Sequence, residues 1–416
     1  MECRHCKNPL EKRILDLGYA PPSNAYLKED DLLKPELTFP LRLYVCQRCF
    51  LVQTEDYSLS EELFPSDYAY FSSVSSSYLS HAKSYCDMII PRLGLNKNKR
   101  VLEIASNDGY LLRNFVAEGI SCIGIEPAAS TADVAESLGI PVIREFFGSE
   151  FAQMFIRVHN PVDLIIGNNV YAHVPDINDF TAGLKIALNQ GGTITLEFQH
   201  ILSLIRYNQF DTVYHEHYSY LSLHNVCRIF DDNNLRIFDA EKISTHGGSL
   251  RVYGCHRNDE RKASNALMDA LEEEDDAGMN DLPFYLTLQP RANRVKYDLL
   301  GFLIEQNRLG KVVAAYGAAA KANTLFNFAG IKQDLIPFIC DAAKSKQGKF
   351  LPGSHIPIVP VSEIIEQKPD YILIVPWNIK GEIIELLDFS KAWGAKFILS
   401  MPEFQVVEQT FSENII

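Results

Sequence analysis

The sequence predicts an α/β protein in which a zinc-ribbon module precedes two Rossmann-like domains. Two Cys-x-x-Cys steps lie near the N-terminus, and two series of short apolar strands alternating with helices follow. Short buried strands that alternate with helices imply mostly parallel sheets covered on both faces. The length of 416 residues also favours several domains, because one hydrophobic core rarely serves so long a chain. We therefore assign residues 1–57 to the zinc module, 58–256 to the first Rossmann-like domain and 257–416 to the second.

The composition is that of an ordinary globular chain, with 47% apolar and 22% charged residues. The net charge of −14 disfavours nucleic-acid binding, because phosphate contacts require a basic face. No run approaches the twenty or so apolar residues of a membrane span, and the N-terminus has no secretory pattern. We therefore expect a cytoplasmic protein without nucleic-acid or membrane partners. The oligomeric state stays open, and a monomer is compatible with the sequence.

The two Cys-x-x-Cys steps predict a zinc site with the ligands Cys3, Cys6, Cys46 and Cys49. Each step lets two thiolates reach one ion, and two steps complete a tetrahedral shell. The alternatives are four unrelated cysteines or a redox pair, although neither step precedes a helix in a βαβ unit. Because four thiolates close the shell, we expect the zinc to be structural. The other five cysteines are expected to be buried free thiols.

Two series of strands define the two Rossmann-like domains, and a helical segment lies between them. The first domain has strand-like runs separated by helical patterns at 109–118 and 130–138, and a long helical pattern then runs from Pro283 to about Arg308. Parallel sheets bind ligands beyond the carboxyl ends of their strands, so the residues after each run are site candidates. The expected strands are 101–104, 122–125, 164–166 and 192–198 in the first domain, and 312–316, 336–340, 372–375 and 397–399 in the second.

The loop after the first of these strands predicts a cofactor site. It ends in small and polar residues, and Glu126 ends the next strand about twenty residues on, where a carboxylate typically accepts ribose hydroxyls. A loop poor in glycine and carrying Asn107 and Asp108 opposes a pyrophosphate but suits a methionine-type cofactor with its amino group and sulfonium. The alternative is a turn that binds nothing. The candidate residues are Glu103, Ala105, Asn107, Gly109, Glu126, Pro127, Asn168 and Asn169, with Phe147 as an aromatic face for adenine or as plain core.

The segment 214–220, with the sequence Tyr-His-Glu-His-Tyr-Ser-Tyr, is the candidate for catalysis. If the segment is extended, His215 and His217 share one face and Glu216 takes the other. A metal site is one alternative, although the spacing differs from that of the helical zinc proteases, and satisfied structural histidines are another. General base catalysis by a histidine, with a carboxylate and a tyrosine beside it, fits the composition better. The Gly-Gly turn after His246 either lines the same cleft or is a hairpin turn.

The second Rossmann-like domain carries a candidate anion site. Lys321 opens a helix after a tight small-residue turn, and Asp341 follows the next strand. A basic residue at a helix N-terminus suits a phosphate, and the loop 344–349 adds three more lysines. These features predict binding of an anionic nucleotide. The alternative is a duplicated fold without a ligand.

Seven motifs, in order along nearly the whole chain, resemble those of the zinc-containing sugar C-methyltransferases, which methylate keto intermediates of nucleotide-linked deoxysugars, as in tetronitrose pathways. The family loop usually carries glycine where this chain has Ala105. The motifs are the double Cys-x-x-Cys, Glu-Ile-x-Ser-Asn-Asp-Gly from Glu103, Asn-Asn-Val-x-Ala-His-Val-Pro-Asp from Asn168, Tyr-His-Glu-His from Tyr214, His-Gly-Gly-Ser-Leu-Arg from His246, Tyr-Gly-Ala-x-x-Lys-x-Asn-Thr from Tyr316, and Lys-Gln-Gly-x-x-Leu-Pro-Gly-x-His-Ile-Pro from Lys346.

The resemblance implies a class I methyltransferase fold with S-adenosylmethionine as methyl donor and structural Zn²⁺. It implies that His217 is the base, that Tyr214, Glu216 and His173 surround the sugar, and that Tyr70 lies near the reactive end. The substrate implied is a nucleotide-linked 4-keto-6-deoxysugar. As its carrier, dTDP is favoured over GDP, and as the methylated carbon, C-3 is favoured over C-5. The residues expected to bind it are His246, Lys321, Asn323, Asp341, Lys346 and His355.

Two other functions compete with this interpretation. Two Rossmann-like domains would also serve an NAD-dependent nucleotide-sugar dehydrogenase or epimerase. A zinc-ribbon adaptor with degenerate α/β domains would bind another protein, but it has no use for the cluster at 214–220.

Overall fold

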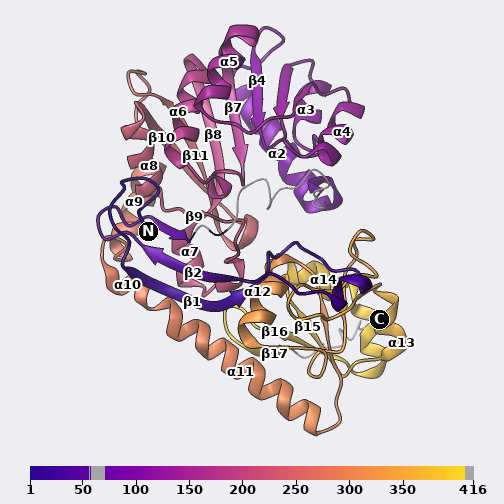
Figure 1. The fold of residues 1–416 in the computed structure, drawn as a ribbon. Coiled ribbons are helices and arrows are strands. Elements are labelled where there is room, and N and C mark those ends of the chain that lie inside the picture. Colours follow the sequence, from indigo (N-terminus) through magenta and orange to yellow (C-terminus); the bar gives the residue numbers. More distant parts are fainter. Residues whose placement is uncertain (56, 58–70, 408–416) are drawn as a thin grey trace, which may run out of the picture. The chain divides into compact units, whose positions relative to one another are not determined.

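The computed structural model describes residues 1–55, 57 and 71–407 (Figure 1). The chain divides into two compact units, each assembled from separated stretches of sequence. Unit 1 consists of Met1–Lys12, Val45–Leu202 and His217–Leu282, and unit 2 of Arg13–Tyr44, Ser203–Glu216 and Pro283–Ile416. Tyr70, expected near the reactive end, lies outside the described residues.

Unit 1 is built on a seven-stranded sheet with the order β10-β11-β8-β7-β4-β5-β6. The five strands from β8 to β6 are parallel, and β11 is antiparallel to both of its neighbours. The strands are β4 (Arg100–Ile104), β5 (Ser121–Ile125), β6 (Val142–Ile143), β7 (Val162–Asn168), β8 (Leu188–Gln199), β10 (Leu235–Ile243) and β11 (Ser249–His256). A short pair, β3 (Val52–Thr54) with β9 (Ser219–Tyr220), lies outside this sheet.

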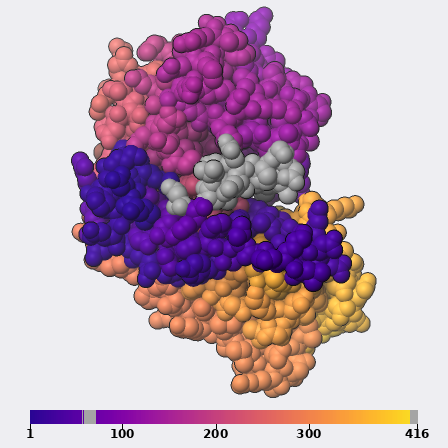
Figure 2. Space-filling view, viewed as in Figure 1, coloured from indigo at the N-terminus to yellow at the C-terminus, as the bar shows by residue number. Residues whose placement is uncertain are grey.

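Two groups of helices flank the sheet of unit 1 (Figure 1). Side chains of α2, α3 and α4 form one buried cluster with strand residues such as Val101, Ile166 and Tyr253, while α5, α6 and α8 pack side by side. In the space-filling view the purple and magenta part of the chain, which contains these strands and helices, forms one continuous surface (Figure 2). The helices are α2 (Ser76–Leu93), α3 (Leu112–Ala117), α4 (Ala129–Ser137), α5 (Ser149–His159), α6 (Ile177–Ala187), α8 (Leu223–Asp232) and α9 (Asn265–Asp276).

Unit 2 contains a six-stranded sheet with the order β14-β13-β12-β15-β16-β17, parallel except for β17. Strands β1 (Lys12–Ala20) and β2 (Phe39–Val45), which come from the N-terminal region of the chain, pair with each other outside this sheet. The strands of the sheet are β12 (Val313–Tyr316), β13 (Ile339–Cys340), β14 (Ile358–Val359), β15 (Tyr371–Ile374), β16 (Lys396–Leu399) and β17 (Gln405–Val407), and the helices are α11 (Leu288–Arg308), α12 (Ala320–Ala329), α13 (Ser362–Gln367) and α14 (Lys380–Leu386). Two further helices, α7 (Ile201–Arg206) and α10 (Leu282–Leu286), span unit boundaries.

All eight strands expected in the two Rossmann-like domains are confirmed, and both domains have mostly parallel sheets as predicted. The long helix expected from Pro283 is instead the short α10 followed by α11. The hairpin of β10 and β11 was not among the expected strands, and its turn at Thr245–Gly247 confirms the hairpin alternative for the Gly-Gly segment. Within 1–55, 57 and 71–407, no helix combines the length and hydropathy needed to cross a membrane.

Candidate functional site

The four N-terminal cysteines come together in unit 1 as predicted. Their sulfur atoms all lie within 4.8 Å of one another, and the Sγ–Sγ distances are 3.5 Å for Cys3–Cys49 and 3.5 Å for Cys6–Cys46. Tetrahedral zinc with Zn–S bonds of about 2.3 Å places sulfurs about 3.8 Å apart, so the donor set fits this ion. A hydrogen bond from Cys49, reinforced by backbone N–H groups, lowers the pKa of the Cys3 thiol to about 5 despite its burial.

The two Cys-x-x-Cys turns have the same backbone geometry. Lys7 and Phe50 each follow the second cysteine with φ of 59° and 58°, and their N–H groups donate to the carbonyls of Cys3 and Cys46 at 3.0 and 2.9 Å. Non-glycine residues enter this left-handed region at a cost, so the two turns hold strain that a bound metal would offset. The sequence did not reveal this pairing, because neither position is glycine.

The cofactor loop follows β4 and is shaped by three residues with positive φ: Ala105 at 55°, Asn107 at 49° and Gly109 at 76°. Glu126, at the end of β5, accepts hydrogen bonds from the N–H groups of Asn107 and Ala128, both at 2.9 Å. Burial raises the pKa of Glu126. The Thr131 side chain also bonds this carboxyl, and the acceptor capacity that remains suits a ribose hydroxyl.

Three buried side-chain acceptors at this sheet edge have no partner among the described residues. They are Oε2 of Glu103, Oδ1 of Asp108 and Oδ1 of Asn168, in side chains at most 8% exposed. Burial, followed by the nearby carboxyls of Glu126 and Asp108, raises the pKa of Glu103 well above its usual range. Unpartnered buried acceptors are costly unless a ligand supplies donors. An ammonium and two hydroxyls, as S-adenosylmethionine carries, match this acceptor set.

The side chains beside Asn169 include residues that the sequence analysis missed. The side-chain amide of Asn169 donates to the Tyr78 hydroxyl at 2.6 Å, and the Tyr78 ring stacks on Tyr110 with centroids 5.2 Å apart. The ring of His246 meets the edge of Tyr78 at 5.9 Å, which places this expected substrate ligand in unit 1. The only local signal for Tyr78 was Ser75, whose side chain caps α2 by accepting from the Tyr78 N–H.

Pro127 and Phe147 are two further residues expected at the cofactor site. Pro127 follows Glu126 directly, and the Phe147 ring packs edge-on against Phe180 of α6 at 5.1 Å. Gly183 accommodates Phe147, because a Cβ there would lie 2.9 Å from the ring. These contacts are those expected of core packing, and the adenine contact of Phe147 stays a prediction.

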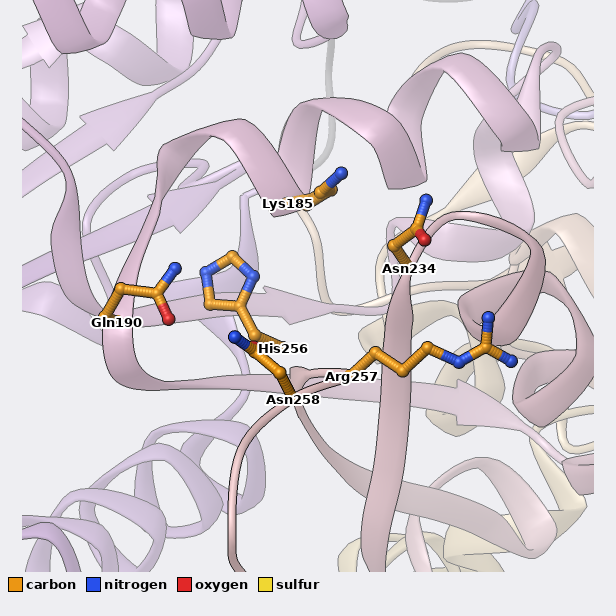
Figure 3. A pocket seen from close by; sticks show the side chains of 6 residues that line it. All are labelled: Lys185, Gln190, Asn234, His256, Arg257 and Asn258. Carbon is orange, nitrogen blue, oxygen red and sulfur yellow. The ribbon is translucent and has the colours of Figure 1, made fainter.

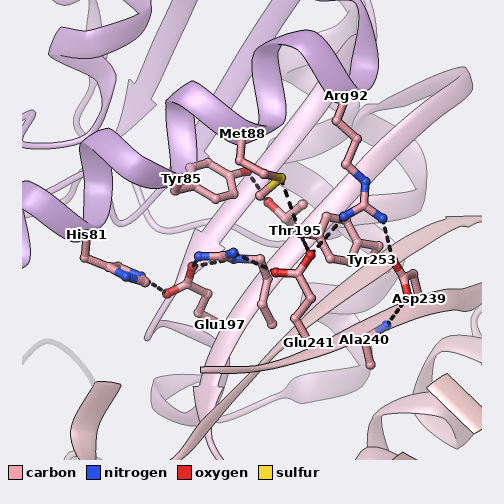
Figure 4. Close-up of polar contacts among 11 residues, drawn as sticks. His81, Tyr85, Met88, Arg92, Thr195, Glu197, Asp239, Ala240, Glu241 and Tyr253 are labelled. Carbon is pink, nitrogen blue, oxygen red and sulfur yellow. Dashed lines mark hydrogen bonds and ion pairs between the residues drawn. The ribbon is translucent and has the colours of Figure 1, made fainter. Parts of the chain in front are cut away.

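A buried ion-pair network lies beneath α2 at the same sheet edge (Figure 4). Glu197 of β8 accepts from His81 at 2.8 Å and from Arg251 at 2.6 Å, and Arg251 also pairs with Glu241 at 2.9 Å. Burial alone would raise the pKa of Glu197, but the His81 hydrogen bond and the Arg251 charge outweigh it and lower the pKa. The Glu197 carbonyl accepts from the Asn169 N–H at 2.7 Å, so the network supports the cofactor edge.

The catalytic candidates divide between the units. In unit 1, the rings of His173 and His217 lie 4.6 Å apart at 63°, and Tyr220 meets His217 at 5.7 Å. Both histidines are half-buried, and His173 ends the 3-10 helix Tyr171–His173 just after β7. The geometry brings together one expected base and one expected sugar contact.

The preceding residues belong to unit 2. His215 and Glu216 form a turn, so the extended conformation considered for this segment is not observed. The amide of Asn24 donates to both oxygens of Glu216, at 2.7 and 2.9 Å. His215 is buried with Nε2 bonded to the Pro40 carbonyl at 3.2 Å, and burial lowers its pKa. Tyr214 is half-buried in the same unit. Among the described residues, the cysteines form the one group of three or more metal-binding side chains.

In unit 2, several of the expected nucleotide ligands gather at the carboxyl edge of β12. Lys346 donates to the Ala318 carbonyl at 2.9 Å and pairs with Asp341 at 3.4 Å. Tyr26, which the sequence analysis missed, donates to the same carbonyl at 2.7 Å. Asn323 donates to the Ser23 carbonyl and has a buried Oδ1 without a partner in the described chain.

Two other expected ligands of unit 2, Lys321 and His355, each lie near a carboxyl group. Burial lowers the pKa of Lys321, and the nearby Asp211 opposes this shift. Asp211 is fully buried, which raises its pKa to about 6, and it accepts from the Trp377 indole at 2.7 Å. His355 pairs with Glu36 at 2.9 Å.

Three family models match consecutive parts of this chain. They are described as "Putative zinc binding domain" over residues 3–64, "Methyltransferase domain" over 78–240 and "C-methyltransferase C-terminal domain" over 244–402. C-methyltransferase NovU from Streptomyces niveus is 32% identical over 406 residues, which cover 98% of this chain and 96% of NovU.

This chain belongs to the C-methyltransferase family.

Solved structures show a weaker likeness. Magnesium protoporphyrin IX methyltransferase from Synechocystis PCC 6803 with bound SAM has a TM-score of 0.34 and 14% identity, covering 43% of this chain and 79% of that one. An S-adenosylmethionine-dependent methyltransferase from Clostridium acetobutylicum has a TM-score of 0.35 and 11% identity, covering 47% and 95%. The family assignment does not depend on either.

As a C-methyltransferase, the protein uses S-adenosylmethionine, has a class I methyltransferase fold in unit 1 and carries a structural zinc module, as the sequence predicted. Family membership decides against the dehydrogenase and adaptor alternatives. The roles assigned to individual residues stay predictions.

A pocket of about 460 Å³ opens at the opposite edge of the sheet, where β8 begins and β11 ends (Figure 3). His256 bonds the Leu188 carbonyl at 3.1 Å, and Arg257 pairs with Asp231 at 3.0 Å. These two groups therefore already have partners, and the pocket lies at the sheet edge opposite the carboxyl ends of β4 and β7. The lining residues are Lys185, Gln190, Asn234, His256, Arg257 and Asn258.

Glu103→Gln tests the buried acceptor set. The raised pKa means that the folded protein holds a proton more tightly than the unfolded chain, so stability falls as the pH rises through the ordinary carboxyl range. We expect Glu103→Gln to raise Tm at pH 7, with the gain shrinking toward about pH 4, and to weaken S-adenosylmethionine binding about tenfold or more. Thermal melts across this pH range and calorimetry measure both effects. The exposed Glu118→Gln is the control, and a fall in Tm at pH 7 would contradict the prediction.

Proposed function

We propose that this C-methyltransferase methylates C-3 of a dTDP-linked 4-keto-6-deoxysugar and that His217 removes the proton from that carbon. The motifs shared with sugar C-methyltransferases support the substrate class. The observation that carries the catalytic assignment is the ring contact of His173 and His217 at 4.6 Å. His173 lies in the 3-10 helix that follows β7, the strand that ends at Asn168.

A ketone acidifies the hydrogen on the neighbouring carbon, so a histidine with a pKa near neutrality can remove it. The C–H electron pair becomes the C=C bond of an enolate, the carbonyl oxygen takes the negative charge, and the proton moves to the imidazole of His217. His173 or a tyrosine of this region would stabilise the oxyanion through a hydrogen bond. S-adenosylmethionine supplies the electrophilic methyl group.

The remaining assignments follow the same proposal. Glu103, Asp108, Glu126 and Asn168 hold the cofactor through the acceptors described above, and Asn169 holds Tyr78 beside them. Lys321, Asn323, Asp341, Lys346 and His355 of unit 2 bind the nucleotide and its diphosphate, with the lysines offsetting the phosphate charge. Zinc, with four thiolate ligands, takes no part in the proton transfer.

His217→Asn tests the assignment of the base. We expect turnover to fall about 10²- to 10⁴-fold, because asparagine cannot accept the proton. Incorporation of solvent deuterium at C-3, followed by mass spectrometry in D₂O, should fall in parallel. His224→Asn, a half-exposed histidine on α8 paired with Asp275 at 2.9 Å, is the control. Unchanged exchange and turnover in His217→Asn would exclude His217 as the base.

The same assay identifies the substrate. Parallel reactions with dTDP- and GDP-linked 4-keto-6-deoxysugars should show the mass gain of one methyl group with the dTDP compound. Fragmentation of the product then locates the methyl group on C-3. Methylation of the GDP compound alone would contradict the proposed carrier.

A further inference from the structure

Arg4 lies inside the first Cys-x-x-Cys turn, between the zinc ligands Cys3 and Cys6. It is 6% exposed, although arginine is rarely buried unless its donors are used. The arginine of the second turn, Arg48, is exposed. Arg4 is the first residue between its two cysteines and Arg48 is the second, so the equivalent of Arg4 in the second turn is Gln47. Gln47 is exposed, so the burial of Arg4 reflects what surrounds it rather than the turn itself.

The guanidinium of Arg4 binds three backbone carbonyls of unit 1. Its Nε donates to Tyr218 at 3.2 Å, Nη1 to Pro175 at 3.0 Å and Nη2 to Thr54 at 3.4 Å. Its central carbon also lies 4.8 Å from the centre of the Tyr218 ring. A planar charged fork that also stacks on an aromatic ring fixes its partners in position as well as distance.

These carbonyls belong to the chain segments that carry the histidine pair. The Thr54 hydroxyl donates to the His217 carbonyl at 3.1 Å, and its N–H donates to the Tyr218 carbonyl at 3.2 Å. The Tyr218 N–H donates to the Ala172 carbonyl at 2.8 Å, next to His173. The peptide groups on both sides of the two rings are therefore tied to one another and to Arg4.

We propose that Arg4 is a positioning residue that couples the zinc turn to the His173–His217 pair. Coordination at Cys3 and Cys6 fixes the backbone of Arg4, and its guanidinium then fixes the peptide groups beside both rings. The inference rests on the proposed role of His217 as the base. It gives the structural zinc a defined influence on turnover without contact between the metal and the substrate.

Charge compensation is the competing explanation for Arg4. Four thiolates and one Zn²⁺ carry a net charge of −2, which a nearby arginine would offset. Lysine keeps the charge but lacks the planar fork, whereas glutamine removes the charge. Positioning therefore predicts that Arg4→Lys is defective with its zinc retained. Charge compensation predicts that Arg4→Lys resembles the wild type and that Arg4→Gln loses zinc.

The experiment compares Arg4→Lys and Arg4→Gln with Arg48→Lys, in the full-length protein. We expect both Arg4 variants to keep one zinc ion by elemental analysis and to bind S-adenosylmethionine within about twofold of wild type, because the three carbonyls that the guanidinium binds lie outside the cofactor loop. Turnover of the dTDP-linked 4-keto-6-deoxysugar should fall about ten- to a hundredfold, with KM for the cofactor little changed. Amide hydrogen exchange at Tyr218 should accelerate at least about tenfold. Arg48→Lys should match wild type throughout.

Wild-type turnover and Tyr218 protection in Arg4→Lys would overturn the proposal, as would loss of zinc from either Arg4 variant. A failure of the proposed function would give a different experimental result from a failure of this inference. If His217→Asn leaves deuterium exchange unchanged, His217 is not the base, but faster Tyr218 exchange in a zinc-loaded Arg4→Lys would still show that Arg4 positions this segment.

Discussion

Cys46→Ser is expected to release the zinc ion and to lower turnover about a hundredfold or more. Serine is a poor zinc ligand, and structural zinc sites contribute folding energy directly. Without the metal, the left-handed residues Lys7 and Phe50 lose the coordination that offsets their strain. Elemental analysis, amide exchange over the first 55 residues and turnover measure the three consequences.

The control for this variant is Cys227→Ser, because Cys227 is a half-buried thiol on α8 outside the cysteine quartet. It should retain zinc and turnover. Full zinc content and normal activity in Cys46→Ser would show that the quartet is not the metal site. Treatment of the wild type with a strong chelator should reproduce the Cys46→Ser phenotype, and added Zn²⁺ should reverse it.

Gly109→Ala is expected to destabilise the protein by about 3 kcal/mol and to abolish measurable cofactor binding. Gly109 has a φ of 76°, and a Cβ there would lie 2.5 Å from Ile140 Cδ1 and 3.1 Å from Ala135 Cβ. The left-handed conformation costs a residue with a Cβ about 1–2 kcal/mol, and overpacking adds about 1–3 kcal/mol. Relief of the clash moves the loop that presents Asn107 and Asp108 to the ligand.

Gly119→Ala separates these two costs. Gly119 has a φ of 67°, but an added Cβ would have no heavy atom within 4 Å. Substitution by alanine there therefore carries the conformational cost without the clash. We expect a loss of about 1 kcal/mol and normal cofactor affinity. Chemical denaturation and calorimetry compare the two variants, and equal destabilisation at both positions would show that packing around Gly109 is not decisive.

The sequence was informative where chemistry depends on residue type and spacing. The cysteine quartet, the acidic end of β5 and the apolar parallel strands all carry local signals, because thiolate geometry and strand burial constrain nearby residues. The hairpin of β10 and β11 was missed, since its strands mix charged network residues such as Glu241 and Arg251 with apolar ones. The pairing of these charges depends on the neighbouring strand and on α2, which no local pattern reveals.

The site was predicted less completely for a related reason. Tyr78 and Arg4 contact residues far away in the sequence, Asn169 and Tyr218, so these contacts appear only when the chain is folded. The left-handed conformations of Ala105, Lys7 and Phe50 were not predicted, because nothing in their residue types requires a positive φ.

The discontinuous make-up of the two units has a consequence for synthesis on the ribosome. Strands β1 and β2 emerge early, but the stretch of unit 2 from Pro283 onward is translated last. During that interval the early strands have exposed edges and no completed core to join. Cys6 and Cys46 bracket these strands in the sequence, so zinc captured early closes a loop around them and shortens the disordered span that must later be organised. Metal supply during translation would then govern the yield of native enzyme as well as its stability afterwards.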